Sequence, residues 1–208
     1  MRVTKSAEER KNEILDVAEQ LFVEKGFDNT STNDIINEVG IARGTLYYHF
    51  KSKEEILDAM VERIRRDKIA QAAAIVASRE LPLLERLSGA VMALNIEGDV
   101  GVEVLEQIHM PENALLHQKM QERVISGVVP VIASLIEEGK ANGIFDTKYP
   151  ADAVEMIITY SSMAFDNLAD LSPEEMQKKS MAFIYHTERV LGAKEGSLSA
   201  AIMKIFNK

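Results

Sequence analysis

The sequence of 208 residues predicts an all-helical (all-α) fold, and two recurring patterns support that prediction. Apolar residues return every three to four positions along most of the chain, as they do on the buried face of an amphipathic helix. Ser-x-x-Glu capping boxes, which mark the first turn of a helix, occur at Ser6–Glu9, Ser52–Glu55 and Ser172–Glu175. No stretch alternates polar and apolar residues as a half-buried strand does. We therefore expect about nine or ten helices of ordinary length and no sheet.

Composition narrows the class of protein. Hydrophobic residues make up 46% of the chain, which is ample for a buried core, yet no apolar run approaches the length of a membrane span. The absence of cysteine excludes disulfides and thiolate metal sites and fits a reducing cytoplasm. The polar N-terminus lacks the apolar segment of a signal peptide. We expect a cytoplasmic protein with no membrane partner.

The net charge of −9 argues against a protein that coats nucleic acid by bulk electrostatic attraction. Residues 1–68 hold 12 Lys and Arg against 14 Asp and Glu, so even the N-terminal part of the chain is not basic. Any binding to DNA must therefore come from a few well-placed cations and helix N-termini, with the acidic residues turned away. Such binding should weaken steeply as salt is added.

The first helix is expected to begin after Ser6 and to end at Gly26. Its apolar stripe carries Ile14, Leu15, Ala18, Leu21 and Phe22. Arg2 and Lys5 precede this helix and form either a flexible arm that reaches nucleic acid or, more simply, a disordered terminus.

A helix-turn-helix is predicted over residues 30–50. One residue of the pair Ser31–Thr32 caps its first helix, with Asp34 as the capping partner. Gly40 permits the positive φ of a tight turn, and the second helix begins near Ala42. On that second helix the apolar residues share one face, whereas two tyrosines and a histidine fall largely on others. A protein gains little by exposing such residues unless something binds them.

The segments Ala42–Leu57 (ARGTLYYHFKSKEEIL) and Ala18–Ile35 (AEQLFVEKGFDNTSTNDI) resemble the recognition helix and the preceding region of the TetR family of bacterial transcriptional regulators. A weaker likeness covers residues 135–153. The resemblance implies an all-helical, homodimeric repressor. Its N-terminal helix-turn-helix, a three-helix DNA-binding domain, would occupy residues 1–51, and a larger helical domain for effector binding and dimerisation would occupy residues 52–208.

The resemblance also implies which residues contact DNA. Those expected at phosphates are Thr30 or Ser31, Thr32, Tyr47, Tyr48, His49 and Lys53. Those expected at base edges, or where the backbone approaches DNA closely, are Ala42, Arg43, Gly44 and Thr45. The residue types agree with these roles, because arginine can donate two hydrogen bonds to guanine and threonine can contact a thymine methyl group. The alternative for Tyr47 is a core position that seals the recognition helix to the first helix.

The remaining helices are expected over residues 52–77, 83–97, 102–109, 112–141, 151–169, 172–191 and 198–206. The first of them leaves no room for a flexible linker, so it should connect the two domains and act as a lever. Its basic run over residues 63–68 is more simply a solvated face than a DNA contact. Pro130 should kink the helix in which it lies.

A hydrophobic effector would suit a pocket in the C-terminal domain, where the patterns are mostly apolar. The candidates for its lining are polar or polarisable residues within those patterns: Asn95, His109, Met120, Tyr160 and Met163. Ordinary core or surface positions are the simpler interpretation for each. The last long helices can pair with those of a second copy in a four-helix interface. The candidates for that interface are Ile158, Phe165, Phe183, Ile184, Thr187 and Leu191.

No metal, cofactor or catalytic site is expected, because the four histidines lack HExxH spacing and neither a GxSxG nor a Walker-type motif occurs. The resulting hypothesis is a repressor that a small-molecule effector releases from a palindromic double-stranded DNA operator. One alternative is a DNA-binding regulator without an effector, which a protein partner controls or which acts as an activator. A helical interaction module or an enzyme is a more distant alternative.

Overall fold

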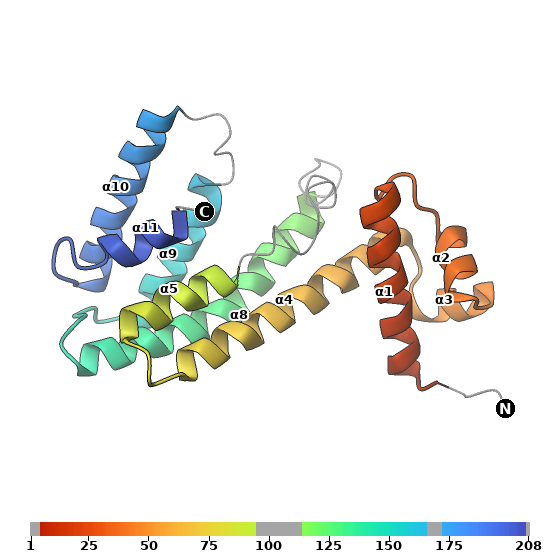
Figure 1. Cartoon of the computed structure of the whole chain (residues 1–208), viewed down its shortest axis with the longest axis horizontal. Helices are drawn as coiled ribbons and strands as arrows, with labels where there is room; N and C mark the ends of the chain where they lie inside the picture. The colour runs from red at the N-terminus through yellow and green to blue at the C-terminus, as the bar shows by residue number, and fades with distance from the viewer. Residues whose placement is uncertain (1–4, 95–113, 166–171, 207–208) are drawn as a thin grey trace. The chain divides into compact units, whose positions relative to one another are not determined.

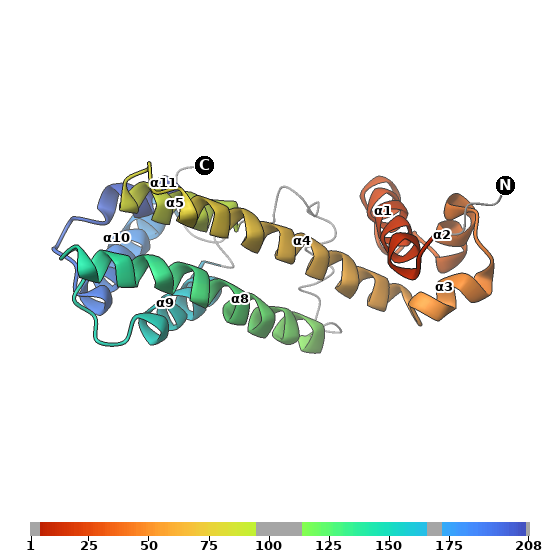
Figure 2. The ribbon, with the colours of Figure 1, turned by 90° about the horizontal axis from the view of Figure 1, so that it is seen from below.

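The computed structural model describes residues 5–94, 114–165 and 172–206, and these residues form nine helices and no strand (Figures 1 and 2). The side chains of residues 114–121, Val124 and Phe206 lie outside this description. The predicted all-helical fold is confirmed. None of the described helices is both long enough and apolar enough to cross a membrane.

The chain divides into two compact units. Unit 1 takes in residues 1–67 and 96–120, and unit 2 takes in residues 68–95 and 121–208. Each unit has a hydrophobic core of its own.

Local capping interactions define the first helix of unit 1, α1 (Ala7–Lys25). The amide of Glu9 donates to the Ser6 hydroxyl (3.2 Å), and the amide of Ser6 donates to the Glu9 carboxylate (2.6 Å). Gly26 ends the helix with a φ of 81°, a conformation that residues with a Cβ resist. Both ends of α1 are therefore where the sequence predicts them.

The predicted helix-turn-helix consists of α2 (Thr32–Val39) and α3 (Arg43–His49). Ser31 caps α2 and forms a capping box with Asp34. Gly40 adopts the left-handed conformation, with φ 71° and ψ 38°. This conformation turns the chain sharply between the two helices.

The core of unit 1 joins α1, α2, α3 and the first half of α4 (Lys53–Ala77). Its largest fully buried side chains are Ile14, Phe22, Ile35, Leu46, Phe50, Ile56, Leu57 and Met60. Because α4 contributes Ile56, Leu57, Met60 and Val61 to this core, the first stretch of unit 1 runs to Asp67. The expected domain boundary at residue 51 stays a prediction. The second half of α4 places Ala72 in the core of unit 2, so one continuous helix belongs to both units.

Unit 2 is built from that second half of α4 and five further helices, the first turns of α8 being grouped with unit 1. They are α5 (Leu83–Ala93), α8 (Ala114–Ala141), α9 (Pro150–Ala164), α10 (Pro173–Leu191) and α11 (Ser199–Phe206). The capping box of Ser172 and Glu175 begins α10, as predicted. The expected helix over 102–109 lies outside the described residues, as do the ends of those over 83–97 and 151–169.

A buried arginine ties three helices of unit 2 together. The Arg86 guanidinium of α5 is paired with the Glu138 carboxylate of α8, with one N–O distance of 3.0 Å. The same group donates to the Val76 carbonyl of α4, also at 3.0 Å. The ion pair and the hydrogen bonds offset the cost of burying the charged guanidinium.

Candidate nucleic-acid interface

The two sides of α3 differ sharply in their environment. Leu46 and Phe50 are buried in the core of unit 1 and anchor the helix from its inner side. Tyr48 lies between them in sequence, yet 78% of its surface is exposed. Its ring meets the His49 ring edge to face, with 5.0 Å between the ring centres. The outer side of α3 thus presents an aromatic pair to solvent on a firmly held helix.

The N-terminal end of α3 is open to another molecule. Ala42, Arg43 and Gly44 are exposed. A Cβ at Gly44 would meet nothing within 4 Å in the described structure, so packing within the chain does not require a glycine there. A glycine in such a place leaves room for the close approach of a partner.

Tyr47 connects the two helices of the motif. Its hydroxyl lies 3.4 Å from the Thr32 hydroxyl of α2, and the guanidinium carbon of Arg43 lies 5.4 Å from its ring centre. The hydrogen bond from Thr32, followed by the interactions with Arg43, lowers the pKa of the Tyr47 phenol. Tyr47 is 38% exposed. It therefore does not occupy the alternative position, a core site between α3 and α1.

Thr30 is buried, which corrects the expectation that its side chain contacts phosphate. Only 1% of Thr30 is exposed. Its hydroxyl shares its hydrogen between the carbonyls of Gly26 (2.8 Å) and Leu21 (3.1 Å) and so closes the loop between α1 and α2. Of the pair Thr30 or Ser31, Ser31 is the exposed residue, and its hydroxyl lies 2.5 Å from the Asp34 carboxylate.

Lys53 makes contacts within unit 1, and its expected contact with phosphate stays a prediction. Its Nζ donates to the Phe27 carbonyl (2.6 Å) and lies 4.1 Å from the centre of the Phe27 ring. The Asp28 carbonyl is a more distant acceptor at 3.5 Å. These contacts hold the first turn of α4 against the loop that follows α1.

Other cations of unit 1 form ion pairs. Arg63 of α4 donates to Asp16 (2.6 Å) and Glu19 (2.8 Å) of α1. Arg65 pairs with Glu62, so the basic run is largely engaged with acidic neighbours and does not form an open DNA-binding stripe.

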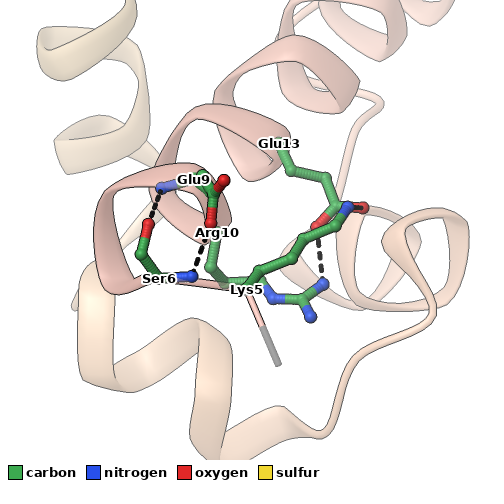
Figure 3. Close-up of polar contacts among 5 residues, drawn as sticks. All are labelled: Lys5, Ser6, Glu9, Arg10 and Glu13. Carbon is green, nitrogen blue, oxygen red and sulfur yellow. Dashed lines mark hydrogen bonds and ion pairs between the residues drawn. The ribbon is translucent and has the colours of Figure 1, made fainter. Parts of the chain in front are cut away.

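A second set of ion pairs lies at the start of α1 (Figure 3). The Glu13 carboxylate binds Lys5 (2.6 Å) through one oxygen and Arg10 (2.5 Å) through the other. The terminal-arm residue Arg2 lies outside the described residues.

Two of the expected effector residues lie on the outside of α9. Tyr160 and Met163 are exposed, Met163 by 74%, and they line an open groove together with Asp152, Glu155 and Met156. They belong to the surface of unit 2, and an enclosed pocket is not built from them. Asn95, His109 and the side chain of Met120 lie outside the described residues.

The expected dimer residues fall on two sides of α9 and α10. Ile184, Thr187 and Leu191 are buried in the chain's own core, which corrects their assignment, because a second copy cannot reach them. Ile158, Phe165 and Phe183 are half-buried. The outward sides of the two helices carry a different set of exposed residues: Met156, Tyr160, Met163, Met181 and Tyr185. We call this set the α9/α10 apolar face.

The spacing of the α9/α10 apolar face was visible in the sequence. Met156, Tyr160 and Met163 follow one another at intervals of four and three residues, as do apolar residues on a single helix face. Both sides of α9 and α10 carry apolar residues, so periodicity alone did not distinguish the core side from the outer side.

The fold and the site together define a helix-turn-helix protein with an open reading helix and a separate helical unit. In the described residues, no cluster of three or more His, Asp or Glu side chains could hold a metal ion. Residues 14–60 match the family described as bacterial regulatory proteins, tetR family, and residues 98–186 match the tetracyclin repressor-like C-terminal domain. The chain belongs to the TetR family, as the resemblance predicted. Members of this family are transcriptional regulators and not enzymes.

Two similar proteins are transcriptional or metabolic regulators by name. Over 125 residues the chain is 34% identical to the HTH-type transcriptional repressor KstR2 of Mycobacterium tuberculosis, which covers 60% of this chain and 58% of the relative. Over 140 residues it is 26% identical to the fatty acid metabolism regulator protein of Bacillus subtilis, covering 63% of this chain and 68% of that protein. The match to the first of these relatives therefore spans less than two thirds of its length.

Solved structures share the fold. A TetR-family transcriptional regulator from Mesorhizobium loti superposes with a TM-score of 0.64 at 17% identity, over 90% of this chain and 98% of that one. The protein RolR, determined with resorcinol, superposes with a TM-score of 0.62 at 17% identity, over 97% of this chain and 95% of its own.

Proposed function

We propose that this protein is a DNA-binding transcriptional repressor that places α3 in the major groove of its operator. The observation that carries the proposal is the contrast on α3 between fully buried Leu46 and Tyr48, which is 78% exposed. The core holds the helix from one side while its N-terminal end and outer side are open to DNA. Membership of the TetR family and the repressor name of a relative support the same assignment.

The exposed and half-buried residues of α3 have roles that their chemistry supports. Arg43 donates two hydrogen bonds to a guanine, Gly44 admits the DNA close to the helix, and Thr45 contacts a thymine methyl group. Tyr48 and His49 donate hydrogen bonds to phosphates and fix the position of α3 along the groove.

The α2 side of the motif supplies further phosphate contacts. Ser31 and Thr32 lie at the start of α2, and Tyr47 is within hydrogen-bond distance of Thr32. These three hydroxyl groups can bind one stretch of backbone, because phosphate oxygens accept hydrogen bonds from such donors without regard to sequence.

Two copies of the chain read a palindromic operator in this proposal. Half-sites one helical turn apart require two reading helices about 34–36 Å apart. The α9/α10 apolar face is the surface we assign to dimerisation, since the same face on two copies can form an isologous four-helix interface.

A small-molecule effector bound by unit 2 releases the operator in this proposal. RolR was determined with resorcinol, a small aromatic molecule, and one relative is named for fatty acid metabolism, so small aromatic molecules and fatty acid derivatives are the first candidates. The effector acts as an inducer only if it binds the conformation with the wrong half-site spacing more tightly than the DNA-binding one.

The test begins by selecting bound DNA from a random pool with the full chain. On the selected operator, the combined change Tyr48→Phe and His49→Ala should weaken binding about tenfold or more, because two hydrogen bonds to charged phosphates are lost. Tyr149→Phe with His186→Ala makes the same chemical changes at exposed positions of unit 2 and should leave the affinity unchanged. A pool that enriches no palindrome, or a Tyr48 and His49 variant that binds as tightly as the control, would overturn the proposal.

A further inference from the structure

We propose that Glu13 competes with DNA for Lys5 and Arg10, so that phosphate groups replace the Glu13 carboxylate as the partner of these cations when the protein binds. The inference rests on the proposed DNA-binding function and deepens it. It assigns to a residue outside the helix-turn-helix the task of limiting how strongly the protein holds DNA.

The geometry of the cluster shows one anion shared by two cations. Figure 3 shows the side chains of Lys5 and Arg10 reaching the end of the Glu13 side chain. Each cation meets a different carboxylate oxygen, at 2.6 Å and 2.5 Å respectively. The hydrogen bond from Lys5, together with the charge of Arg10, lowers the pKa of the Glu13 carboxyl, so it is ionised at neutral pH. Lys5, Arg10 and Glu13 together carry one net positive charge, which becomes two when Glu13 is neutralised. The Glu9 carboxylate is a second anion nearby, since the charge of Lys5 also contributes to lowering its pKa.

The cluster stands on a rigid part of α1. The capping box of Ser6 and Glu9 fixes the first turn of the helix. In that box the Glu9 carboxylate accepts a hydrogen bond from the Ser6 amide, so Glu9 already has a role in capping α1. Glu13 is therefore the carboxylate whose release would leave Lys5 and Arg10 for another anion.

The position of the cluster relates it to the reading helix. Lys11, which follows Arg10 in the chain, places its Nζ 5.9 Å from the ring centre of Phe50, the residue that ends α3. The start of α1 and the end of α3 are therefore neighbours within unit 1. In the proposal, DNA held by α3 extends past the start of α1, where its phosphates reach Lys5 and Arg10.

The ion pairs of Glu13 can be exchanged at low cost. Lys5 is exposed and Arg10 is half-buried, so water already screens both attractions and the pairs add little stability. Arg63 differs, since it joins two carboxylates of α1 to α4 with its side chain mostly buried. Lys5 and Arg10 are therefore the cations that DNA can recruit without disturbing the core of unit 1.

The competition weakens binding to every DNA sequence, because phosphates carry no sequence information. The protein is acidic, and Glu13 pairs with two of its cations, so its affinity for non-specific DNA stays low. Base contacts from α3 still select the operator. Glu13 thus sets the general affinity, and the residues of α3 set the preference for one sequence.

The test is Glu13→Gln, which keeps the length and the helix propensity of the side chain but removes its charge. Binding is measured with the selected operator and with a random-sequence duplex of equal length, at several salt concentrations. The variant should bind both duplexes about threefold to tenfold more tightly at low salt, and the slope of log K against log salt should steepen by about 0.9 for each cation that gains a phosphate. Glu24→Gln, at the other end of α1 where the carboxylate accepts the Gln20 amide (2.8 Å), is the matched control and should match the wild type.

Two further outcomes decide the inference. Adding Lys5→Ala and Arg10→Ala to Glu13→Gln should abolish the gain, whereas a gain that persists would show that the charge of Glu13 acts without these cations and would overturn the competition. A Glu13→Gln variant that equals Glu24→Gln in affinity and slope, while the wild type binds its operator, overturns this inference alone. A wild type that binds no DNA overturns the proposed function as well. Circular dichroism confirms that each variant is folded.

Discussion

The hydroxyl of Thr30 acts at the scale of a single residue, because it satisfies two carbonyls in a place that water does not reach. Thr30→Val preserves the shape of the side chain but removes the donor to Leu21 and Gly26. We expect the free energy of unfolding to fall by about 1–3 kcal/mol, the cost of leaving buried polar groups unpaired. Urea denaturation followed by circular dichroism measures this change.

The role of Thr30 is distinguished from a DNA contact by the affinity of the folded protein for DNA. The folded fraction of Thr30→Val should bind DNA with the wild-type affinity, because no phosphate contact has been removed. Thr32→Val is the control for stability alone, since the exposed Tyr47 hydroxyl that lies 3.4 Å from the Thr32 hydroxyl can bond to water in its place. Equal losses of stability in the two variants would contradict the buried role of Thr30.

At the scale of the element, α9 and α10 each carry apolar residues on two sides with different tasks. Met163→Glu places a charge on the α9/α10 apolar face, where the side chain is exposed in the single chain. We expect the proposed dimer to dissociate without loss of helix content, because the protomer core does not contain this residue. Sedimentation velocity at micromolar concentration measures the change, and Val23→Glu, a like substitution at an exposed site of α1, is the control.

The inner side of α10 should respond in the opposite way. Leu191 is buried in the core of unit 2, so Leu191→Ala should lower the free energy of unfolding by about 2–5 kcal/mol. A dimer that survives Met163→Glu, or a protomer that unfolds because of it, would contradict the division between the two sides.

At the scale of the whole molecule, capping boxes and ion pairs make stability depend on pH. Hydrogen bonds from the helix-capping serines lower the pKa values of Glu9, Asp34 and Glu175, and the hydrogen bond from Arg86 lowers that of Glu138. A carboxyl whose pKa is lower in the folded state than in the unfolded state stabilises the fold above its unfolded pKa of about 4. That stability is lost as pH falls through the folded pKa.

We therefore expect the free energy of unfolding to be nearly constant from pH 7 to about pH 5 and to decrease below that range. Urea denaturation at pH 7, 4 and 3 measures it. Glu138→Gln should be less stable than the wild type at pH 7 and should lose less on acidification, because one of the responsible carboxyl groups is gone. An equal free energy of unfolding at pH 7 and pH 3 would contradict the role of these groups.

The long helix α4 is the other feature of this scale. It contains neither glycine nor proline between Lys53 and Ala77, and it contributes side chains to both cores. The expectation that α4 acts as a lever between unit 2 and unit 1 stays a prediction. The continuity of the helix supports it. Since Ile56, Leu57, Met60 and Val61 are part of the core of unit 1, the start of α4 and the helix-turn-helix should move as one body.

The sequence by itself determined the all-helical class, the ends of α1, α2 and α10, and the helix-turn-helix. These features depend on residues within one turn of each other, such as Ser31 with Asp34 or the positive φ of Gly40. The tertiary structure alone decided which polar residue of the motif faces solvent and which side of a helix faces the core. Lys53 and Leu191 owe their positions to contacts with residues distant along the chain, and Thr30 owes its position to carbonyls brought to it by the fold of the loop after α1. Local pattern cannot reveal those contacts.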